Sequence, residues 1–458
     1  MIMTNLEMIR DTEEILHHLE YAKLKADTFI DELPGSIDKK LLCALWYERF
    51  SDILMRRKKD KIKNFIFNTI KKVIEYVTLF RPQFKKNRKF KNDFVFIFGS
   101  AVHRMIVKEL IAKLRDYGFS IVEYEDYNLN IYEKFKYMII GIKHIQLKKS
   151  DILLLSPNLF FSLLFFCGLL SHYRPKITIC FNETTPKAGL LSHVCEMTHS
   201  KSVNIAHAIS AKTPLRQNSP FDYHIVYGEK SKKNIIENNG IVDGEIVSLG
   251  ALKMDKYFKD TKSKKQRYIK NIDKNSEKKL LIVGSWKGHF LDDTLDHMYT
   301  FLSEFAQNHP DLSFIYKPHP LEVGSRNAYS LKFSQLKNCT IIPPESNLLK
   351  TIDSVDIVLL GWSAVGLEAA IRKKPVIVVN PCNVPDWLSY IESEYGLEIK
   401  SFRELESAIK EIYRDYDYYC RKAEEFVELH LENKGKACEE IYTFLIKILD
   451  YTVINVKE

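Results

Sequence analysis

The sequence predicts an α/β fold in which two parallel-sheet domains follow a helical N-terminal extension. Short apolar runs recur along the chain, and several are followed by Gly or Ser and then by apolar residues at helical spacing. This alternation of strand, turn and helix is typical of doubly wound parallel sheets. A polar, charged stretch from Lys259 to Lys279 separates two such series and is the expected hinge. We therefore expect a helical basic extension at 1–91, a first sheet domain at 92–262, and a second with a helical tail at 263–458.

The composition is that of an ordinary globular protein with a positively charged surface. Of 458 residues, 45% are apolar and 28% are charged, and 68 Lys and Arg against 59 Asp and Glu give a net charge of +9. This balance favours anionic partners such as nucleotides, acidic lipids or acidic glycans. The 8 cysteines are scattered, without a C-x-x-C pair or the spacing of zinc ligands. Because no signal-peptide pattern precedes them, the sequence predicts a cytoplasmic protein without a metal site.

The N-terminal extension is expected to be helical and basic. Apolar residues at helical spacing predict helices at Leu6 to Leu33 and at Ile37 to Met55. Residues 56–91 are rich in Lys and Arg, with an apolar stripe between the charges. Such a helix either lies on the acidic inner face of the cytoplasmic membrane or packs its stripe on the next domain, and both interpretations stay open. Further along, Pro157 to Leu170 is too short to span a bilayer of about 30 Å and is expected to be a buried core helix.

The first sheet domain is expected to open with a strand at Phe94 to Phe98 and a helix from Ala101 to Tyr117. In a doubly wound sheet, the turn after the first strand faces the crevice where ligands bind. Ser100, His103 and Arg104 lie at this turn and are candidate acceptor-binding residues. The alternative interpretation is a plain capped helix.

Two further strands of this domain deliver a carboxylate and an imidazole to the same edge. The expected strand Lys176 to Cys180 leads to Glu183, and the expected strand Val203 to Ala206 leads to His207. A general base must lie within hydrogen-bond reach of the proton that it removes, and consecutive strands suit this requirement. Glu183 and His207 are therefore the candidate bases, with a surface cap and a packed neutral histidine as the respective alternatives.

In the second sheet domain, two strands end in residues suited to a phosphate. The first expected strand leads to Gly284 and Ser285. The second, Leu312 to Tyr316, delivers Lys317 and His319 in the segment KPHP. A cationic group and a hydrogen-bonding imidazole at one strand end predict an anion-binding edge.

A third strand of this domain, Asp356 to Leu360, breaks at Gly361 and leads to a helix that begins at Ala364. Ser363 is the expected N-cap of this helix. Unpaired backbone N–H groups and the positive end of a helix dipole suit a phosphate. Glu368 lies in the first helical turns, where a carboxylate accepts hydrogen bonds from ribose hydroxyls. The candidate donor-binding residues are thus Lys317, His319, Gly361, Ser363, Ala364, Glu368, Gly284 and Ser285.

These motifs together resemble a known family. KPHP, followed by S-x-x-x-x-E-A ahead of a K-P-V-I strand, is similar to the C-terminal half of the GT-B glycosyltransferases that build bacterial surface polysaccharides. The relatives include polysialyltransferases, capsule 3-deoxy-octulosonate transferases, teichoic-acid polyol-phosphate polymerases and, more distantly, UDP-N-acetylglucosamine 2-epimerases. His207 matches the histidine of the family's Q-H-G motif, with Ala206 and Ala208 as its neighbours, and Gly250 and Asp255 fit its G-[SN]-P-x-x-D segment.

The resemblance implies a GT-B fold, in which two Rossmann-like domains face a crevice, and a metal-independent inverting glycosyltransferase without a cofactor. A CMP-activated 3-deoxy acid sugar, sialic acid or octulosonate, is the favoured nucleotide-sugar donor. The implied acceptor is a bacterial surface glycan or a lipid-linked molecule, and no nucleic-acid partner is expected. The implied catalytic residues are Glu183 or His207 as the base and His319, which holds the leaving phosphate with Ser363, while Glu368 holds the ribose.

Three other functions stay open. One is a CDP-polyol phosphotransferase, one is a UDP-N-acetylhexosamine 2-epimerase, and one is a non-catalytic assembly subunit. A metal-dependent transferase is disfavoured because the sole D-x-D, Asp415 to Asp417, is expected on a helix surface. Motifs of P-loop ATPases, dinucleotide-binding enzymes and serine hydrolases do not occur in the sequence.

Overall fold

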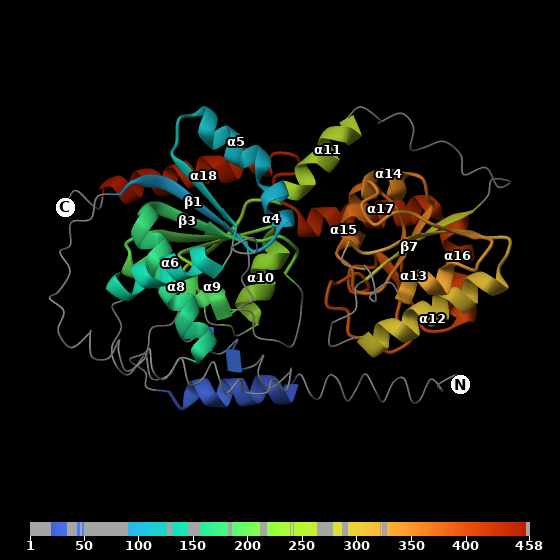
Figure 1. The fold of residues 1–458 in the computed structure, drawn as a ribbon. Coiled ribbons are helices and arrows are strands. Elements are labelled where there is room, and N and C mark those ends of the chain that lie inside the picture. The colour runs from blue at the N-terminus through green and yellow to red at the C-terminus, as the bar shows by residue number, and fades with distance from the viewer. Residues whose placement is uncertain are drawn as a thin grey trace. The chain divides into compact units, whose positions relative to one another are not determined.

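The chain forms two compact units, each built on one sheet (Figure 1). One unit holds the described residues of Leu19–Ala208, Pro214–Lys253 and Lys436–Glu458, and the other is chiefly Met254–Gly435. The computed structural model describes residues 20–33, 44–45, 48–49, 90–125, 131–144, 156–181, 186–210, 218–238, 240, 242–262, 278–285, 292–320, 322 and 328–454.

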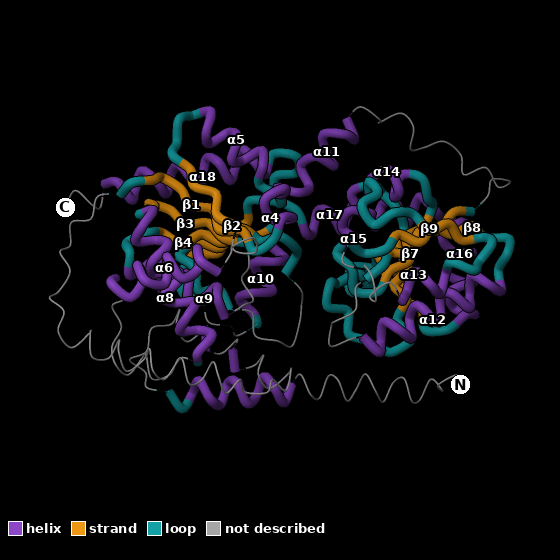
Figure 2. Tube along the Cα trace, viewed as in Figure 1, coloured by secondary structure: helices purple, strands orange, loops and turns teal. Residues whose placement is uncertain are grey.

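The first unit is built on a six-stranded parallel sheet with the strand order β2-β1-β3-β4-β5-β6. Figure 2 shows β1, β3 and β4 side by side in this sheet. The strands predicted at Phe94 to Phe98, Lys176 to Cys180 and Val203 to Ala206 are confirmed, with ends that differ by one or two residues. The strands are β1 (Asn92–Phe98), β2 (Ile121–Glu125), β3 (Pro175–Cys180), β4 (Lys201–Ile205), β5 (Tyr223–Val226) and β6 (Glu245–Ser248). The helices of this unit are α4 (Ala101–Ile106), α5 (Lys108–Asp116), α6 (Ile131–His144), α8 (Pro157–Tyr173), α9 (Pro186–Met197), α10 (Glu229–Glu237) and α18 (Ala437–Ile454).

Helices cover both faces of this sheet because successive side chains of a strand point to opposite faces. Phe94, Phe96 and Phe98 of β1 pack in one apolar cluster with residues of α5 and α18. Val95 and Ile97 belong to the opposite cluster, with residues of α8 and α9. The burial of β1 on both faces explains the uninterrupted apolar run from Phe94 to Phe98.

Helix α8 lies in the core of the first unit, which confirms the prediction at Pro157 to Leu170. It crosses α6 closely because both helices carry a glycine at the contact. A Cβ at Gly141 would lie 1.8 Å from the Leu164 carbonyl oxygen, and one at Gly168 would lie 1.7 Å from the Tyr137 carbonyl oxygen. Among the residues that the structure describes, no helix combines the length and the apolar character needed to cross a membrane.

The described part of the N-terminal extension packs on the same core. Residues 20–31 are helical, within the helix predicted at Leu6 to Leu33, and Ala26 and Ile30 join the cluster around α8. The rest of that helix, most of the helix predicted at Ile37 to Met55 and almost all of the basic stretch 56–91 lie outside the described residues.

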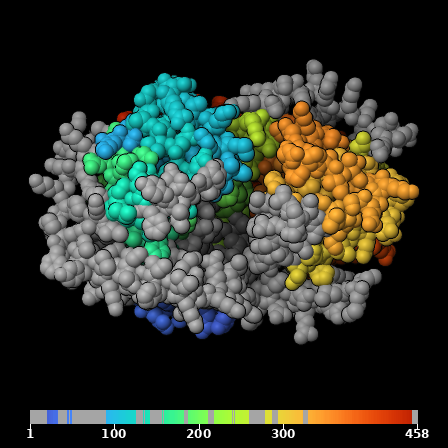
Figure 3. Space-filling view, in the orientation of Figure 1, coloured from blue at the N-terminus to red at the C-terminus, as the bar shows by residue number. Residues whose placement is uncertain are grey.

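The single helix predicted from Ala101 to Tyr117 is wrong, because α4 and α5 are separate helices. Val107 leaves helical geometry between them, with φ −100° and ψ 7°. Val107 is completely buried, whereas Val102 and Met105 of α4 are 54% and 69% exposed. The break therefore lets Val107 and α5 pack on the sheet while α4 stays on the surface of its unit (Figure 3).

The second unit contains another six-stranded parallel sheet, with the order β12-β11-β10-β7-β8-β9. The strands predicted at Leu312 to Tyr316 and Asp356 to Leu360 are confirmed, each beginning one residue later than predicted. The strands are β7 (Lys279–Val283), β8 (Ser313–Lys317), β9 (Cys339–Ile341), β10 (Ile357–Leu360), β11 (Val376–Val379) and β12 (Gly396–Ile399). The helices are α11 (Asp255–Lys262), α12 (Asp292–Asn308), α13 (Ala328–Phe333), α14 (Leu348–Asp353), α15 (Val365–Ile371), α16 (Phe402–Arg414) and α17 (Tyr416–His430).

The last helix, α18, packs on the first sheet. Ile441, Leu445 and Ile448 are buried in the cluster that contains the phenylalanines of β1. The end of the chain therefore contributes to the core of the first unit, although in sequence it follows the second sheet. The domain limits at 91/92 and 262/263 stay predictions.

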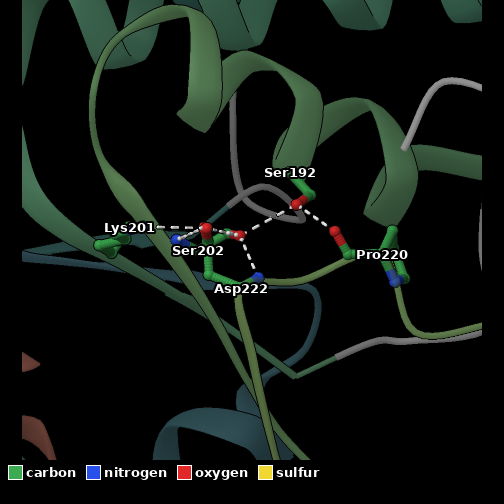
Figure 4. A network of polar contacts seen from close by, with 5 residues as sticks. All are labelled: Ser192, Lys201, Ser202, Pro220 and Asp222. Atoms are coloured by element: carbon green, nitrogen blue, oxygen red, sulfur yellow. Dashed lines mark hydrogen bonds and ion pairs between the residues drawn. The ribbon is translucent and has the colours of Figure 1, made fainter. Parts of the chain in front are cut away.

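Polar side chains hydrogen-bond to one another where β4 and β5 begin, at the amino edge of the first sheet. Asp222, just before β5, accepts hydrogen bonds from Ser202 N at 2.8 Å and from Ser202 Oγ at 2.7 Å, and Lys201 Nζ lies 3.3 Å from its other oxygen (Figure 4). Ser192 of α9 lies 2.9 Å from Ser202 Oγ and donates to the Pro220 carbonyl at 2.6 Å. These bonds fix the register of β4 against β5. They lie at the amino edge of the sheet, opposite the carboxyl edge from which the candidate site residues emerge.

Candidate active site

Three loops emerge at the carboxyl edge of the second sheet. The strands β7, β8 and β10 are neighbours and run parallel, so the residues that follow them emerge at the same edge. Gly284 and Ser285 follow β7, Pro318 and His319 follow β8, and Gly361 follows β10. The structure thus brings the predicted phosphate-binding residues to one edge of one sheet.

Gly284 allows the loop after β7 to touch the KPHP segment. Its N–H donates to the Lys317 carbonyl at 2.8 Å. A Cβ at this position would lie 2.7 Å from His319 N, 2.7 Å from Lys317 O and 2.8 Å from Pro318 Cα, all of them backbone atoms. Only glycine permits this approach, and the KPHP backbone is therefore held against β7.

The Lys317 side chain turns inward. Its ammonium donates to the Pro344 carbonyl at 2.7 Å, and the residue is only 9% exposed. Burial lowers the pKa of Lys317, while the carboxylate of Glu345 acts in the opposite direction. The predicted contact of Lys317 with a donor stays a prediction, and in this structure the side chain supports the loop at 343–346.

His319 is half-buried at the end of the same strand. The pKa of His319 is lowered, chiefly by burial and to a lesser extent by the neighbouring positive charge of Lys317. A neutral imidazole is therefore favoured near neutral pH, and such a ring carries one N–H donor for a phosphate oxygen. The backbone N–H of His319 donates to a carboxylate oxygen of Glu322 at 3.3 Å. The position of His319 thus depends on a residue that the sequence analysis did not single out.

The prediction of Ser363 as N-cap of a helix from Ala364 is wrong in detail, because α15 begins one residue later. Ala364 is the N-cap and offers no side-chain bond, whereas Ser363 Oγ accepts from Val365 N at 3.3 Å. The Ser363 carbonyl accepts from Tyr390 Oη at 2.6 Å, which fixes the turn. With seven residues, α15 is short, so the dipole argument for a phosphate is weaker than the sequence indicates.

Glu368 is buried in α15 and lies near Tyr390. It is 4% exposed, and its charge adds to the burial that raises the pKa of Tyr390. The predicted contact of Glu368 with a ribose stays a prediction.

A small hollow lies beside this turn. Its lining includes Gly361, Trp362, Asn380, Asp386 and Trp387, and its volume is about 10 Å³. This is room for about one water molecule, so the hollow by itself does not accommodate a nucleotide base.

In the first unit, His207 follows β4 and is oriented by the end of β3. Its Nδ1 lies 3.1 Å from the carbonyl oxygen of Phe181. A carbonyl oxygen only accepts hydrogen bonds, so Nδ1 carries the proton of the neutral ring, and Nε2 is left as the hydrogen-bond acceptor. If His207 is the base, as predicted, this geometry makes Nε2 the nitrogen that takes the proton. Phe181 contributes through its backbone, and no residue-type signal in the sequence could have identified it.

The three candidate acceptor residues differ in their surroundings. The ring of His103 lies 5.2 Å from that of His207 and 5.6 Å from that of Phe181, between ring centroids. Ser100 caps α4 by accepting from His103 N at 3.5 Å. Arg104 turns to β2, where Nε lies 2.9 Å from a Glu123 oxygen and Nη1 lies 2.6 Å from a Glu125 oxygen. The structure thus brings His103 to His207 and directs Arg104 to a carboxylate pair.

The other candidate base, Glu183, lies outside the described residues, as do its neighbours at 182–185. Asp415 and Asp417 of the D-x-D sequence are exposed at the start of α17, as expected. Within the described ranges, no three His, Cys, Asp or Glu side chains are grouped as metal ligands.

The fold is similar to those of solved structures of two kinds of enzyme. The UDP-GlcNAc 2-epimerase from Neisseria meningitidis bound to UDP-GlcNAc aligns with 78% of this chain and 100% of its own, at 16% identity and a TM-score of 0.52. The wall teichoic acid polymerase TagF aligns with 90% of this chain and 98% of its own, at 13% identity and a TM-score of 0.50. These likenesses establish a GT-B-like fold, as predicted.

The family follows from the sequence match. The model of the CDP-glycerol:poly(glycerophosphate) glycerophosphotransferase family matches residues 191–447, more than half of the chain. The chain belongs to this family of transferases. It is also 28% identical over 120 residues to the lipopolysaccharide-processing protein LpsZ of Rhizobium meliloti, a match that covers 24% of this chain and 26% of the relative. The chain therefore spans about a quarter of the length of that relative.

Proposed function

We propose that this protein transfers a polyol phosphate, such as glycerol phosphate, from a CDP-activated donor to an acceptor of a bacterial surface polymer. The observation that carries the proposal is the family match over residues 191–447, which includes both His207 and His319. The likeness to a wall teichoic acid polymerase and the short match to a lipopolysaccharide-processing protein support a role in surface polymers.

The proposed reaction needs a base for the acceptor hydroxyl. The acceptor oxygen attacks the β-phosphorus of the CDP-polyol, a new P–O bond forms, and the bond between that phosphorus and the bridging oxygen breaks. The polyol phosphate passes to the acceptor and CMP leaves. His207 Nε2 takes the hydroxyl proton, because Nδ1 is occupied by the Phe181 carbonyl. Glu183 is the alternative base.

The leaving CMP needs hydrogen-bond donors for its phosphate. His319 supplies an imidazole N–H at the end of β8, and Ser285 and Ser363 supply hydroxyl groups on the neighbouring loops. We propose that these groups act without a metal ion or cofactor and that Glu368 contacts the ribose. Donors fixed before the reaction stabilise developing charge without reorganising during it.

The second candidate is transfer of an acid sugar from a CMP-activated donor, and the KPHP segment favours it by its resemblance to such transferases. The same groups would serve, because CMP is again the leaving group. The bond formed would then be a C–O bond at the anomeric carbon instead of a P–O bond.

A thermal-shift panel with CMP, CDP, UDP, GDP and ADP tests the nucleotide, since a ligand that binds the folded state alone raises its melting temperature. The proposal predicts that the cytidine nucleotides raise the melting temperature most. A selective shift with UDP would favour the epimerase, and no shift at all would favour a non-catalytic subunit. Phosphorus analysis of the product then separates polyol-phosphate transfer from acid-sugar transfer.

A lipid-linked acceptor would place this reaction at the inner face of the cytoplasmic membrane. Washing the protein off membranes with increasing salt tests that placement, because electrostatic attachment weakens as ionic strength rises.

A further inference from the structure

Glu322 is a buried carboxylate next to the KPHP segment, and the proposed reaction does not use it directly. It is 1% exposed. One of its oxygens accepts from Tyr316 Oη at 2.8 Å and from His319 N at 3.3 Å. The other accepts from Ser330 N at 2.9 Å and from Ser330 Oγ at 2.8 Å. The carboxylate therefore ties together the end of β8, the His319 turn and the helix α13.

The main chain closes the same turn. The N–H of Glu322 donates to the His319 carbonyl at 2.8 Å, so His319 and Glu322 are linked in both directions. Movement of the Glu322 side chain would therefore move the peptide that carries the His319 imidazole.

The surroundings of this carboxylate are aromatic and tightly packed. Tyr316 stacks on Phe333 with ring centroids 4.5 Å apart, and Tyr299 lies 4.3 Å from Tyr329. Tyr299 also donates to the Val283 carbonyl at 2.9 Å, which connects the cluster to β7. Close packing leaves Tyr316 little freedom, so its hydroxyl is a fixed anchor for the carboxylate.

A buried carboxylate is costly unless donors surround it. Burial raises the pKa of Glu322, and the bonds from Ser330, Tyr316 and His319 act in the opposite direction. An apolar residue would fill the same volume without this cost but would leave the His319 N–H without its acceptor. A carboxylate at this buried position is therefore explained by its hydrogen bonds to the turn that carries His319.

We propose that Glu322 is the positioning residue for His319. Its carboxylate fixes the backbone of the KPHP turn so that the imidazole meets the phosphate of the leaving nucleotide. This inference rests on the proposed function, because the position of His319 matters only if His319 acts on the donor. A displacement of about 1 Å at a reacting group can lower a rate about 100-fold.

The test is a double-mutant cycle with the full-length protein and the transfer assay. Glu322→Gln keeps the shape but offers one acceptor oxygen in place of two, so either the His319 N–H or the Ser330 N–H loses its acceptor. We expect kcat to fall about 10- to 100-fold while the KM for the donor changes less than about threefold, as for a group that acts in the transition state. Glu404→Gln, which removes a carboxylate at the exposed start of α16, is the matched control and should leave kcat unchanged.

The decisive comparison is made in the His319→Ala background. If Glu322 acts through His319, Glu322→Gln should lower the remaining rate less than about twofold there, since no imidazole is left to position. An equal loss in both backgrounds, or a normal kcat in Glu322→Gln itself, would overturn the proposal.

Two further measurements keep the test interpretable. If Glu322→Gln does not fold, Ser330→Ala loosens the same carboxylate by removing one donor, and its smaller loss of kcat should likewise vanish in the His319→Ala background. If His319→Ala alone retains full activity, the proposed function of His319 fails and Glu322 loses its role with it. If His319→Ala is inactive but Glu322→Gln is normal, only the positioning role fails.

Discussion

The contact between Gly284 and the KPHP segment gives the sharpest test of how the donor edge is built. In Gly284→Ala, the new Cβ would lie 2.7 Å from His319 N and from Lys317 O, about 0.7 Å short of an ordinary contact at 3.4 Å. The neighbours are backbone atoms of β8 and its turn, so they cannot rotate away and must move together. Overpacking of this kind costs about 1–3 kcal/mol of stability.

The same displacement should reach the imidazole. A shift of about 0.7 Å in the His319 backbone is expected to lower kcat for transfer by about 10- to 100-fold. Gly99→Ala is the control for stability, because its Cβ would meet only the His103 ring, at 3.8 Å. Urea unfolding and the transfer rate are measured on both variants. Wild-type stability and wild-type kcat in Gly284→Ala would refute the argument that this close approach positions His319.

Three further predictions concern other parts of the two units. His207→Gln should lower kcat by about 100- to 10,000-fold with nucleotide affinity nearly unchanged, measured by steady-state kinetics and calorimetry, because it removes the proposed base. Arg372→Met should lower the free energy of unfolding, measured in urea, by about 2 kcal/mol, because the buried Arg372 guanidinium loses two 2.6 Å hydrogen bonds to the partly exposed Asp353 carboxylate. Adding Asp353→Asn should restore much of the loss. Because the pKa of His319 is lowered from 6.5 on folding, the unfolded chain binds more protons below that value. As the pH falls from 7.5 to about 5.5, the wild type should therefore lose more free energy of unfolding than His319→Gln does. An equal loss in the two proteins would contradict this prediction.

The sequence predicted the two sheets well because their strands are buried on both faces. In β1, for example, the run from Phe94 to Phe98 is entirely apolar, and Gly and Ser follow directly where the strand ends. The sequence did not predict the break at Val107, because the apolar spacing continues through it. The position of the break depends on how α5 packs against the sheet.

The candidate site was predicted in part. His319 and Gly284 emerge at one sheet edge because the strands that they follow, β8 and β7, are parallel neighbours. Glu322 was missed because its partners Tyr316 and Ser330 are assembled by the turn itself. The carbonyl that orients His207 lies 26 residues earlier in the chain, just after the end of the neighbouring strand β3, which no local motif can reveal.

The nature of the transferred group was the least predictable feature. The residues proposed to bind phosphate and ribose would contact only the nucleotide, and CMP leaves from both a CDP-polyol and a CMP-activated sugar. The KPHP motif favoured the acid sugar, whereas the family match favours the polyol phosphate, which the sequence motifs had left open as an alternative.

Transfer of the β-phosphorus tests the central claim most directly. CDP-glycerol labelled with ³²P at the β-position is incubated with the protein and a lipid-linked glycerol-phosphate primer, with His319→Ala run in parallel. The account predicts that the label enters the primer, that unlabelled CMP is released, and that both rates fall about 100- to 1,000-fold in His319→Ala. Label that stays in CDP-glycerol while the protein turns over a CMP-activated acid sugar or UDP-N-acetylglucosamine would contradict the account.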